Sequence, residues 1–139
     1  MKYMLIMRDN DEAAALSRDA DFDEMIRVMG AYNDALTAAG VLVGVQGLED
    51  PAQGFIVDFS HEPPMVTDGP YGETHELFNG YWIIDVSSRE EAAQWASRAP
   101  LGRGSKMEVR RIPSIEEAFG DHLDAQQLAT AAERPADSN

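Results

Sequence analysis

An α+β fold is predicted by three features of this 139-residue chain. Apolar stretches of strand length alternate with stretches of helical periodicity, and capping residues mark the helix starts. The elements follow the order strand, helix, strand, hairpin, strand, helix, strand. This order uses a strand-helix-strand unit twice, which is the layout of a ferredoxin-like antiparallel sheet with both helices on one face.

The first half of the chain opens with a strand over residues 2–8, where apolar side chains alternate between both faces. Asp21, with Glu24 three positions later, predicts the start of a helix whose apolar residues recur at helical spacing until Gly40. A β-branched run over residues 41–48 predicts the next strand, and its glycines indicate a bulge or a close backbone approach.

A small hairpin follows, formed by the apolar pieces 55–59 and 65–67 on either side of two consecutive prolines. Residues 81–86 predict a central strand, because large apolar side chains occupy both of its faces.

The remaining elements lie between residue 88 and the end of the chain. Ser88 with Glu91 predicts the second helix, and residues 106–112 predict the last strand of the core. Residues 1–113 are therefore expected to form one domain. Residues 114–139 are expected to hold a short helix and then an acidic, flexible tail.

Composition excludes several functional classes. The chain has no cysteine, so it has no disulfide, thiolate nucleophile or cysteine-based metal site. Its net charge of −14 disfavours nucleic acid, and its one basic concentration, Lys106 with Arg110 and Arg111, is too small for a DNA footprint. No apolar run approaches the roughly 18 residues that cross a bilayer, and the start lacks the features of a signal peptide. We therefore expect a cytoplasmic protein without a nucleic-acid or membrane partner.

One face of the predicted sheet has no helix to cover it. Met4 and Ile6, like Tyr81 and Ile83, would expose apolar surface there. The simplest cover is a second copy of the same sheet, which predicts a homodimer that buries on the order of 1,600 Å². The terminal helix is the alternative cover.

The segment 68–76 concentrates the residues that chemistry requires. Its structural interpretation is a turn, in which Pro70 restricts its own φ angle and Gly69 allows a wide range of φ. The Asp68 carboxylate would accept hydrogen bonds from backbone amides further along this turn. In the functional interpretation, the turn directs Asp68 into a pocket, and alternation places Tyr71, Glu73 and His75 on one side. A carboxylate that fixes one imidazole nitrogen would leave the other as a base for a bound small molecule.

The candidate catalytic residues are thus Asp68, Glu73 and His75, and the candidate ligand-binding residues are Gly69, Pro70, Tyr71 and Glu76. A metal interpretation would combine His61 with the carboxylates, but no paired-histidine spacing supports it. Neither a metal nor an organic cofactor is predicted.

Several segments resemble the YCII-related family, in the branch marked by an Asp-Gly-Pro-Phe signature. The matching segments, in family order and spacing, are residues 2–7, 39–44, 47–48, 68–76, 80–86, 91–92, 95–96 and 108–110. Tyr71 stands where the signature has Phe, and His75 stands where the pattern usually has Lys. The resemblance implies a dimeric α/β-barrel form of the ferredoxin-like fold. It also implies links to small aromatic compounds in some relatives and to extracytoplasmic-function sigma factors in others.

Two functions remain open at this point. The first is a dimeric protein that binds or transforms a compact organic acid or aromatic compound near Asp68 and His75. The second is a non-catalytic accessory or regulatory module linked to extracytoplasmic-function sigma factor systems. No motif decides whether the protein is an enzyme.

Overall fold

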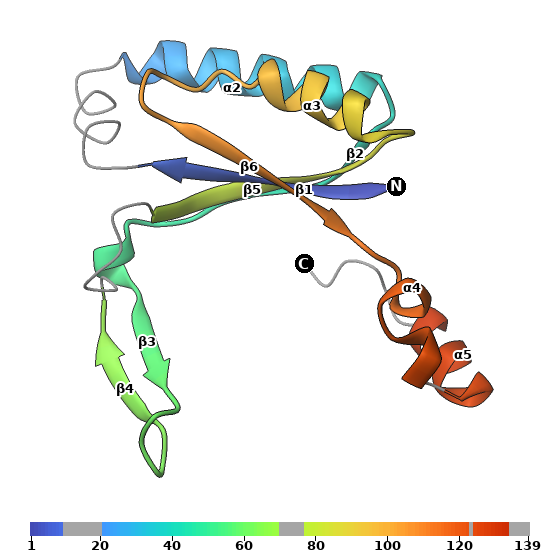
Figure 1. The fold of residues 1–139 in the computed structure, drawn as a ribbon. Helices are drawn as coiled ribbons and strands as arrows, with labels where there is room; N and C mark the ends of the chain where they lie inside the picture. The colour runs from blue at the N-terminus through green and yellow to red at the C-terminus, as the bar shows by residue number, and fades with distance from the viewer. Residues whose placement is uncertain (10–20, 70–76, 123, 134–139) are drawn as a thin grey trace.

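The computed structural model describes residues 1–9, 21–69, 77–122 and 124–133. They form an α+β fold with a four-stranded antiparallel sheet, a separate two-stranded hairpin and helices (Figure 1). The strands are β1 (Lys2–Asp9), β2 (Leu42–Gly47), β3 (Phe55–Asp58), β4 (Met65–Asp68), β5 (Leu77–Asp85) and β6 (Lys106–Ile112). The helices are α2 (Phe22–Ala38), α3 (Arg89–Ser97), α4 (Ile115–Phe119) and α5 (Ala125–Glu133), with short 3-10 turns at Pro51–Gln53 and Gly120–His122.

The strands of the large sheet run in the order β2-β5-β1-β6, so β5 and β1 are central and β2 and β6 are its edges. The predicted central position of residues 81–86 is therefore confirmed. Figure 1 shows α2 and α3 on the same side of this sheet, as the order of elements predicted. No described helix lies across the other side, which we call the open face.

Helices α2 and α3 begin where the capping residues predicted. The Asp21 carboxylate accepts hydrogen bonds from the backbone amides of Asp23 and Glu24, at 3.0 and 3.3 Å. At α3, Ser88 Oγ accepts from the Glu91 amide at 3.1 Å. The Glu91 carboxylate accepts from the Ser87 amide instead of the Ser88 amide, so only half of the predicted capping box forms.

The apolar stripe of α2 is buried only in the second half of the helix. Tyr32 and Leu36 are buried, whereas Phe22 and Ile26 near the start are 69% and 57% exposed. Helical spacing predicted a single continuous stripe. Its first turns carry apolar residues that the described sheet does not cover.

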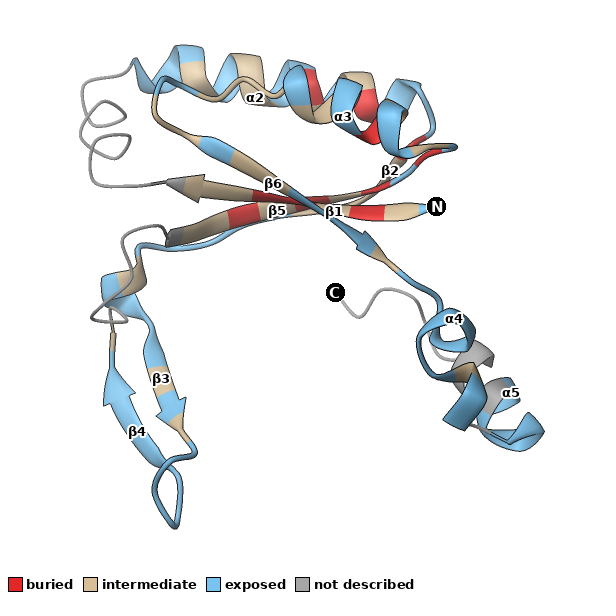
Figure 2. Cartoon of the chain, viewed as in Figure 1, coloured by how far each residue is buried: buried red, intermediate tan, exposed pale blue. Residues whose placement is uncertain are grey.

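The core lies between the sheet and the inner sides of α2 and α3, as the burial colours of Figure 2 show. Trp82 connects the two layers. Its Nε1 donates a hydrogen bond to Asn33 Oδ1 at 2.7 Å, and its ring meets Tyr32 edge-on at 5.3 Å between centroids. The Tyr32 hydroxyl donates to the Trp95 carbonyl at 2.7 Å, which ties α2 to α3. Burial raises the pKa of Tyr32 to about 12, so this donor stays protonated at neutral pH.

Of the two alternatives predicted for the glycines of residues 41–48, the bulge is present, whereas a Cβ at Gly47 would have no neighbour within 4 Å and the close approach falls on Gly80 of β5. The register of β2 against β5 shifts between Leu42 and Gly44, which is the expected bulge. A Cβ on Gly80 would lie 2.9 Å from the Gln46 carbonyl oxygen and 3.3 Å from Gly47 Cα. This approach requires glycine on β5 opposite the end of β2.

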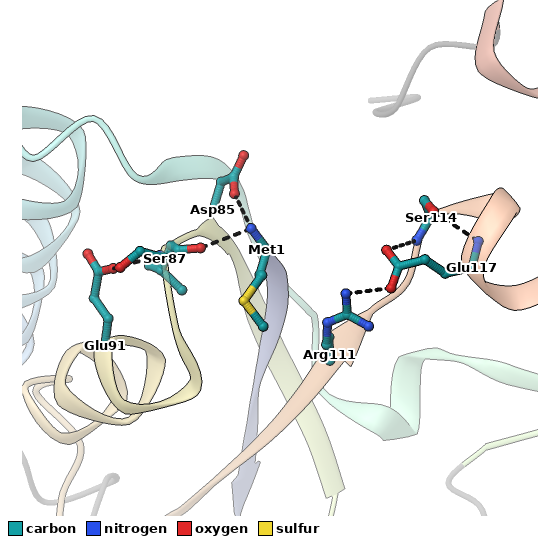
Figure 3. Close-up of polar contacts among 8 residues, drawn as sticks. Met1, Asp85, Ser87, Glu91, Arg111, Ser114 and Glu117 are labelled. Atoms are coloured by element: carbon teal, nitrogen blue, oxygen red, sulfur yellow. Dashed lines mark hydrogen bonds and ion pairs between the residues drawn. The ribbon is translucent and has the colours of Figure 1, made fainter.

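The C-terminal region leaves the end of β6. Ser114 and Glu117 form the predicted capping box of α4, and the Glu117 carboxylate also accepts from Arg111 at 2.6 Å (Figure 3). The structure adds helix α5 to the one short helix expected here. Among the described residues, no helix is both long and apolar enough to cross a bilayer.

Candidate functional site

Asp68 is the last residue of β4 and stands at the base of the β3–β4 hairpin. It pairs with Phe55 in the antiparallel register, and all four residues of β4 are exposed. Because strand side chains alternate, Asp68 shares one face of the hairpin with Phe55, Val57 and Val66. A carboxylate therefore stands beside three exposed apolar side chains.

The backbone around Gly69 fixes the base of this hairpin. The Gly69 amide donates a hydrogen bond to the Gly54 carbonyl at 2.8 Å. A Cβ at Gly69 would lie 2.5 Å from the Pro51 carbonyl oxygen and 3.0 Å from that of Gly54. Only glycine allows the chain to pass this close to the 3-10 turn, so Gly69 follows Asp68 for a packing reason.

Replacing Gly69 by alanine should loosen the base of the hairpin, because the Cβ would displace backbone atoms. We expect a cost of about 1–3 kcal/mol, which corresponds to a roughly 5- to 160-fold loss of protection of the Gly69-to-Gly54 hydrogen bond. Amide hydrogen exchange of residues 54–69 measures this. Gly102→Ala is the matched control, because nothing lies within 4 Å of a Cβ there. Equal exchange in the two variants would contradict the packing role.

The other predicted site residues are not placed by the structure. Pro70, Tyr71, Glu73, His75 and Glu76 lie outside the described residues. Their predicted roles as catalytic or ligand-binding groups stay predictions, together with the expected alternation of Glu73 and His75.

His61 lies in the loop at the tip of the hairpin, at the opposite end from Asp68. Its Nε2 is 3.7 Å from Asp58 Oδ2, and the other oxygen of Asp58 accepts the Ser60 amide at 2.8 Å. Hydrogen bonds from Ser60 hold the pKa of Asp58 below its usual value. A four-residue strand separates His61 from Asp68 by roughly 10 Å or more, so these two residues do not form one metal site.

The open face of the large sheet is the second surface of interest. Strand register confirms that Met4, Ile6, Tyr81 and Ile83 all belong to it, because the odd-numbered Tyr3 and Leu5 pack in the core with α2. Phe78 adds a ring that meets Tyr81 edge-on at 6.2 Å. The centre of the open face is thus apolar and partly aromatic. Its predicted exposure is only partly present, because Ile6 is buried at 3% exposure in the single chain and Met4, Tyr81 and Ile83 are half-buried.

Basic side chains surround this apolar centre. Four basic residues belong to the open face by register, namely Lys2, Arg8, Lys106 and Arg110, against the two acidic residues Glu108 and Asp85. Arg8 Nε donates to Glu108 at 2.5 Å, and Asp85 accepts from the N-terminal ammonium at 3.0 Å (Figure 3). Lys2 and Arg110 form no ion pair within the described part of the chain. A protein of net charge −14 therefore carries excess positive charge on its open face.

Reasoning from the sequence missed this distribution of charge. Lys106, Arg110 and Arg111 were grouped as one basic concentration, although Arg111 pairs with Glu117 and lies on the opposite face from Arg110. The signal was present, since residues 110 and 111 of one strand must point to opposite faces.

The comparisons with known proteins agree with the resemblance seen in the sequence. A sequence model of the YCII-related domain family matches residues 1–116. The chain belongs to the YCII-related domain family. An uncharacterized protein of Rhizobium meliloti (strain 1021) is 30% identical to it over 112 residues, which are 78% of this chain and 89% of that protein. The YCII-related match thus spans the large sheet, α2, α3, the hairpin and the start of α4.

Proposed function

We propose that this YCII-related protein is a homodimer that binds a small neutral aromatic molecule at the base of the β3–β4 hairpin. The Asp68 carboxylate accepts a hydrogen bond from a hydroxyl group of this ligand. In this proposal the ferredoxin-like fold adopts its dimeric α/β-barrel form, in which the open faces of two sheets meet. The observation that carries it is the exposed Asp68 carboxylate beside Phe55, Val57 and Val66, on a backbone fixed by Gly69.

Charge narrows the ligand class. Residues 55–76 contain five carboxylates, two histidines and neither lysine nor arginine. A carboxylate ligand would be repelled, whereas an aromatic hydroxyl would donate a hydrogen bond to Asp68 and place its ring on the apolar side chains. Of the two ligand classes left open by the sequence, the aromatic compound therefore fits better than the organic acid.

His75 gives this site a route to acid-base chemistry. Its imidazole titrates near neutrality, and a carboxylate of Asp68 or Glu73 would fix its tautomer. In a ligand with two hydroxyl groups, such as catechol, one hydroxyl would donate its hydrogen bond to Asp68 and the free nitrogen of His75 would accept the proton of the other. In this proposal His75 is the base, and Glu73 or Asp68 orients its imidazole. The residues of the segment from Gly69 to Glu76 surround the ligand.

Binding of phenol, catechol and benzoate, followed by nuclear magnetic resonance, tests the proposal. We expect catechol and phenol to shift resonances of the hairpin while benzoate does not. Asp68→Asn should weaken binding by roughly tenfold, because a charged hydrogen-bond acceptor is lost. His75→Gln should flatten the dependence of binding on pH between about 5 and 8, the range in which an imidazole titrates.

Asp34→Asn is the matched control, because Asp34 is an exposed aspartate on α2. It should leave binding unchanged. If the Asp68 variant binds as the wild type does, the site is wrong. If none of the three compounds binds and a protein partner is found instead, the accessory or regulatory module is the better function.

A further inference from the structure

Helices α4 and α5 stand beside the open face of the sheet. They follow β6, and Figure 1 shows them on the side of the sheet opposite α2 and α3. We call the described residues between 115 and 133 the C-terminal unit. A short connection joins α4 to β6, and the ion pair of Arg111 with Glu117 at 2.6 Å holds the helix against the strand (Figure 3). The C-terminal unit therefore has a defined position at the Ile112 end of the β6 edge.

The C-terminal unit leaves apolar side chains uncovered. Ile115 and Phe119 are 46% and 54% exposed, and they share one side of α4 because they are four residues apart. Helix α4 contacts mainly α5 and the 3-10 turn Gly120–His122. No residue of α4 belongs to the core cluster of the described residues. An apolar pair on a helix that is held in place is typical of a surface that another chain covers.

The sheet-face dimer proposed above gains little area from its sheets alone. Four strands about 4.8 Å apart and about seven residues long, at about 3.3 Å per residue, give each open face a footprint of about 440 Å². Two such faces cover about 900 Å², whereas stable interfaces bury roughly 1,200–2,000 Å². Side-chain roughness raises the accessible area above the footprint, yet the sheets alone still form an interface at the low end of this range. Elements that project beside the open face are therefore expected to contribute to the contact.

Two symmetric arrangements stack a pair of open faces. A two-fold axis parallel to the strands lays the partner's β2 over β6, whereas an axis perpendicular to the strands lays the partner's β6 over β6. At the Ile112 end of β6, the parallel axis brings the Leu42 end of the partner's β2. The perpendicular axis brings the Lys106 end of the partner's β6 to the same place. An edge strand of the partner therefore lies next to α4 in both arrangements.

The charge of the C-terminal unit is compatible with either edge strand. Residues 114–133 contain five carboxylates and neither lysine nor arginine. At the partner's β6 they would meet Lys106, and opposite charges attract. At the partner's β2 they would meet a strand without a charged residue. Asp85 of the neighbouring β5 is paired there with the N-terminal ammonium, so it adds little repulsion.

We propose that the C-terminal unit of each protomer docks on an edge strand of a second copy of this chain, through Ile115 and Phe119. The proposal rests on the sheet-face dimer proposed above and adds a second contact region to it. Two-fold symmetry forms this contact twice, once for each protomer. The match to the YCII-related family ends at residue 116, so most of the C-terminal unit lies beyond the matched residues.

Photo-cross-linking of the full chain tests the contact. Benzoylphenylalanine in place of Phe119 keeps an aromatic side chain and reacts on irradiation with C–H bonds next to it. We expect a covalent dimer on a denaturing gel, with the cross-link in β2 or β6 of the other copy when its peptides are identified by mass spectrometry. A cross-link to β2 indicates the parallel axis, and one to β6 indicates the perpendicular axis. The same probe in place of Phe22, which is 69% exposed on α2, is the matched control and should give no covalent dimer.

Two results would overturn the docking of the C-terminal unit. The first is a Phe119 probe that reacts only within its own chain, although the protein sediments as a dimer. The second is a Phe22 probe that gives as much covalent dimer as the Phe119 probe. Either result in a protein that is dimeric and binds catechol would leave the proposed function intact. If the unmodified protein sediments as a single chain, the dimer that both proposals share is wrong.

Substitution provides an independent measurement. Phe119→Asp in the full chain should raise the dissociation constant of the dimer by about tenfold or more, because it replaces a large apolar side chain in the interface with a carboxylate. Phe22→Asp makes the same change on the other side of the sheet and should leave the dissociation constant unchanged. Circular dichroism must show that both variants are folded. An unchanged dissociation constant in the Phe119 variant would contradict the docking.

Discussion

Ile83→Asp should convert the dimer that we propose for the wild type into a particle with the 15.3 kDa mass of one chain. Ile83 pairs with Met4 and lies on the open face, where the proposed dimer buries it against a second sheet. Two-fold symmetry brings two copies of the new carboxylate into this interface, and an unpaired buried charge is costly. We expect the dissociation constant to rise by about 100-fold or more. Light scattering and sedimentation measure the mass.

The control is the same substitution, isoleucine to aspartate, on the side of the sheet opposite the open face. Ile26→Asp alters an isoleucine on α2 that is already 57% exposed, so it should leave the dimer intact. Circular dichroism must show that both variants are folded. A wild-type protein that sediments as one chain, or an Ile83 variant that remains dimeric, would contradict the sheet-face interface.

Trp82→Ala should destabilise the fold by about 3–5 kcal/mol, because it removes a large buried ring and leaves a cavity. Trp82 is only 3% exposed, packs edge-on against Tyr32 and donates to Asn33. Single domains have roughly 5–15 kcal/mol of total stability, so this loss is a large fraction of it. Urea unfolding at one fixed protein concentration measures the change, since the stability of a dimer depends on concentration.

Conservative variants divide this loss into packing and hydrogen bonding. Trp82→Phe keeps a ring but removes the indole donor, and we expect about 1–2 kcal/mol from the lost bond and the smaller ring. Phe22→Ala is the surface control, because Phe22 is 69% exposed, and it should change stability by about 0.5 kcal/mol or less. Equal losses in Trp82→Ala and Phe22→Ala would contradict the central role of Trp82.

The local elements were predictable because their signals are local. Asp21, Ser88 and Ser114 cap helices that begin one residue later, since a cap depends only on a side chain and the next few amides. The two-residue period of β1 predicted that Met4 and Ile6 oppose Tyr3 and Leu5, which the register confirms.

The candidate site was less predictable from these signals. Segment 68–76 was identified by its residue types, which say what chemistry is available but not which surface holds it. The structure locates Asp68 and Gly69, while the proposed roles of His75 and Glu73 await the binding measurements. The sequence predicted the hairpin but not that its apolar side chains are exposed, since alternation does not reveal whether a strand packs on the core.

The sequence by itself determined helices α2, α3 and α4, the strands, the faces of β1 and the family to which the chain belongs, whereas helix α5 was not predicted. Each of these depends on neighbouring residues or on a pattern that the letters carry directly. Only the tertiary structure decided that the hairpin projects away from α2 and α3, and that Lys2 and Arg110 lie at the opposite end of the sheet from it. These facts depend on how segments distant in the chain pair and pack, such as Gly69 against Pro51, and no local period encodes such contacts.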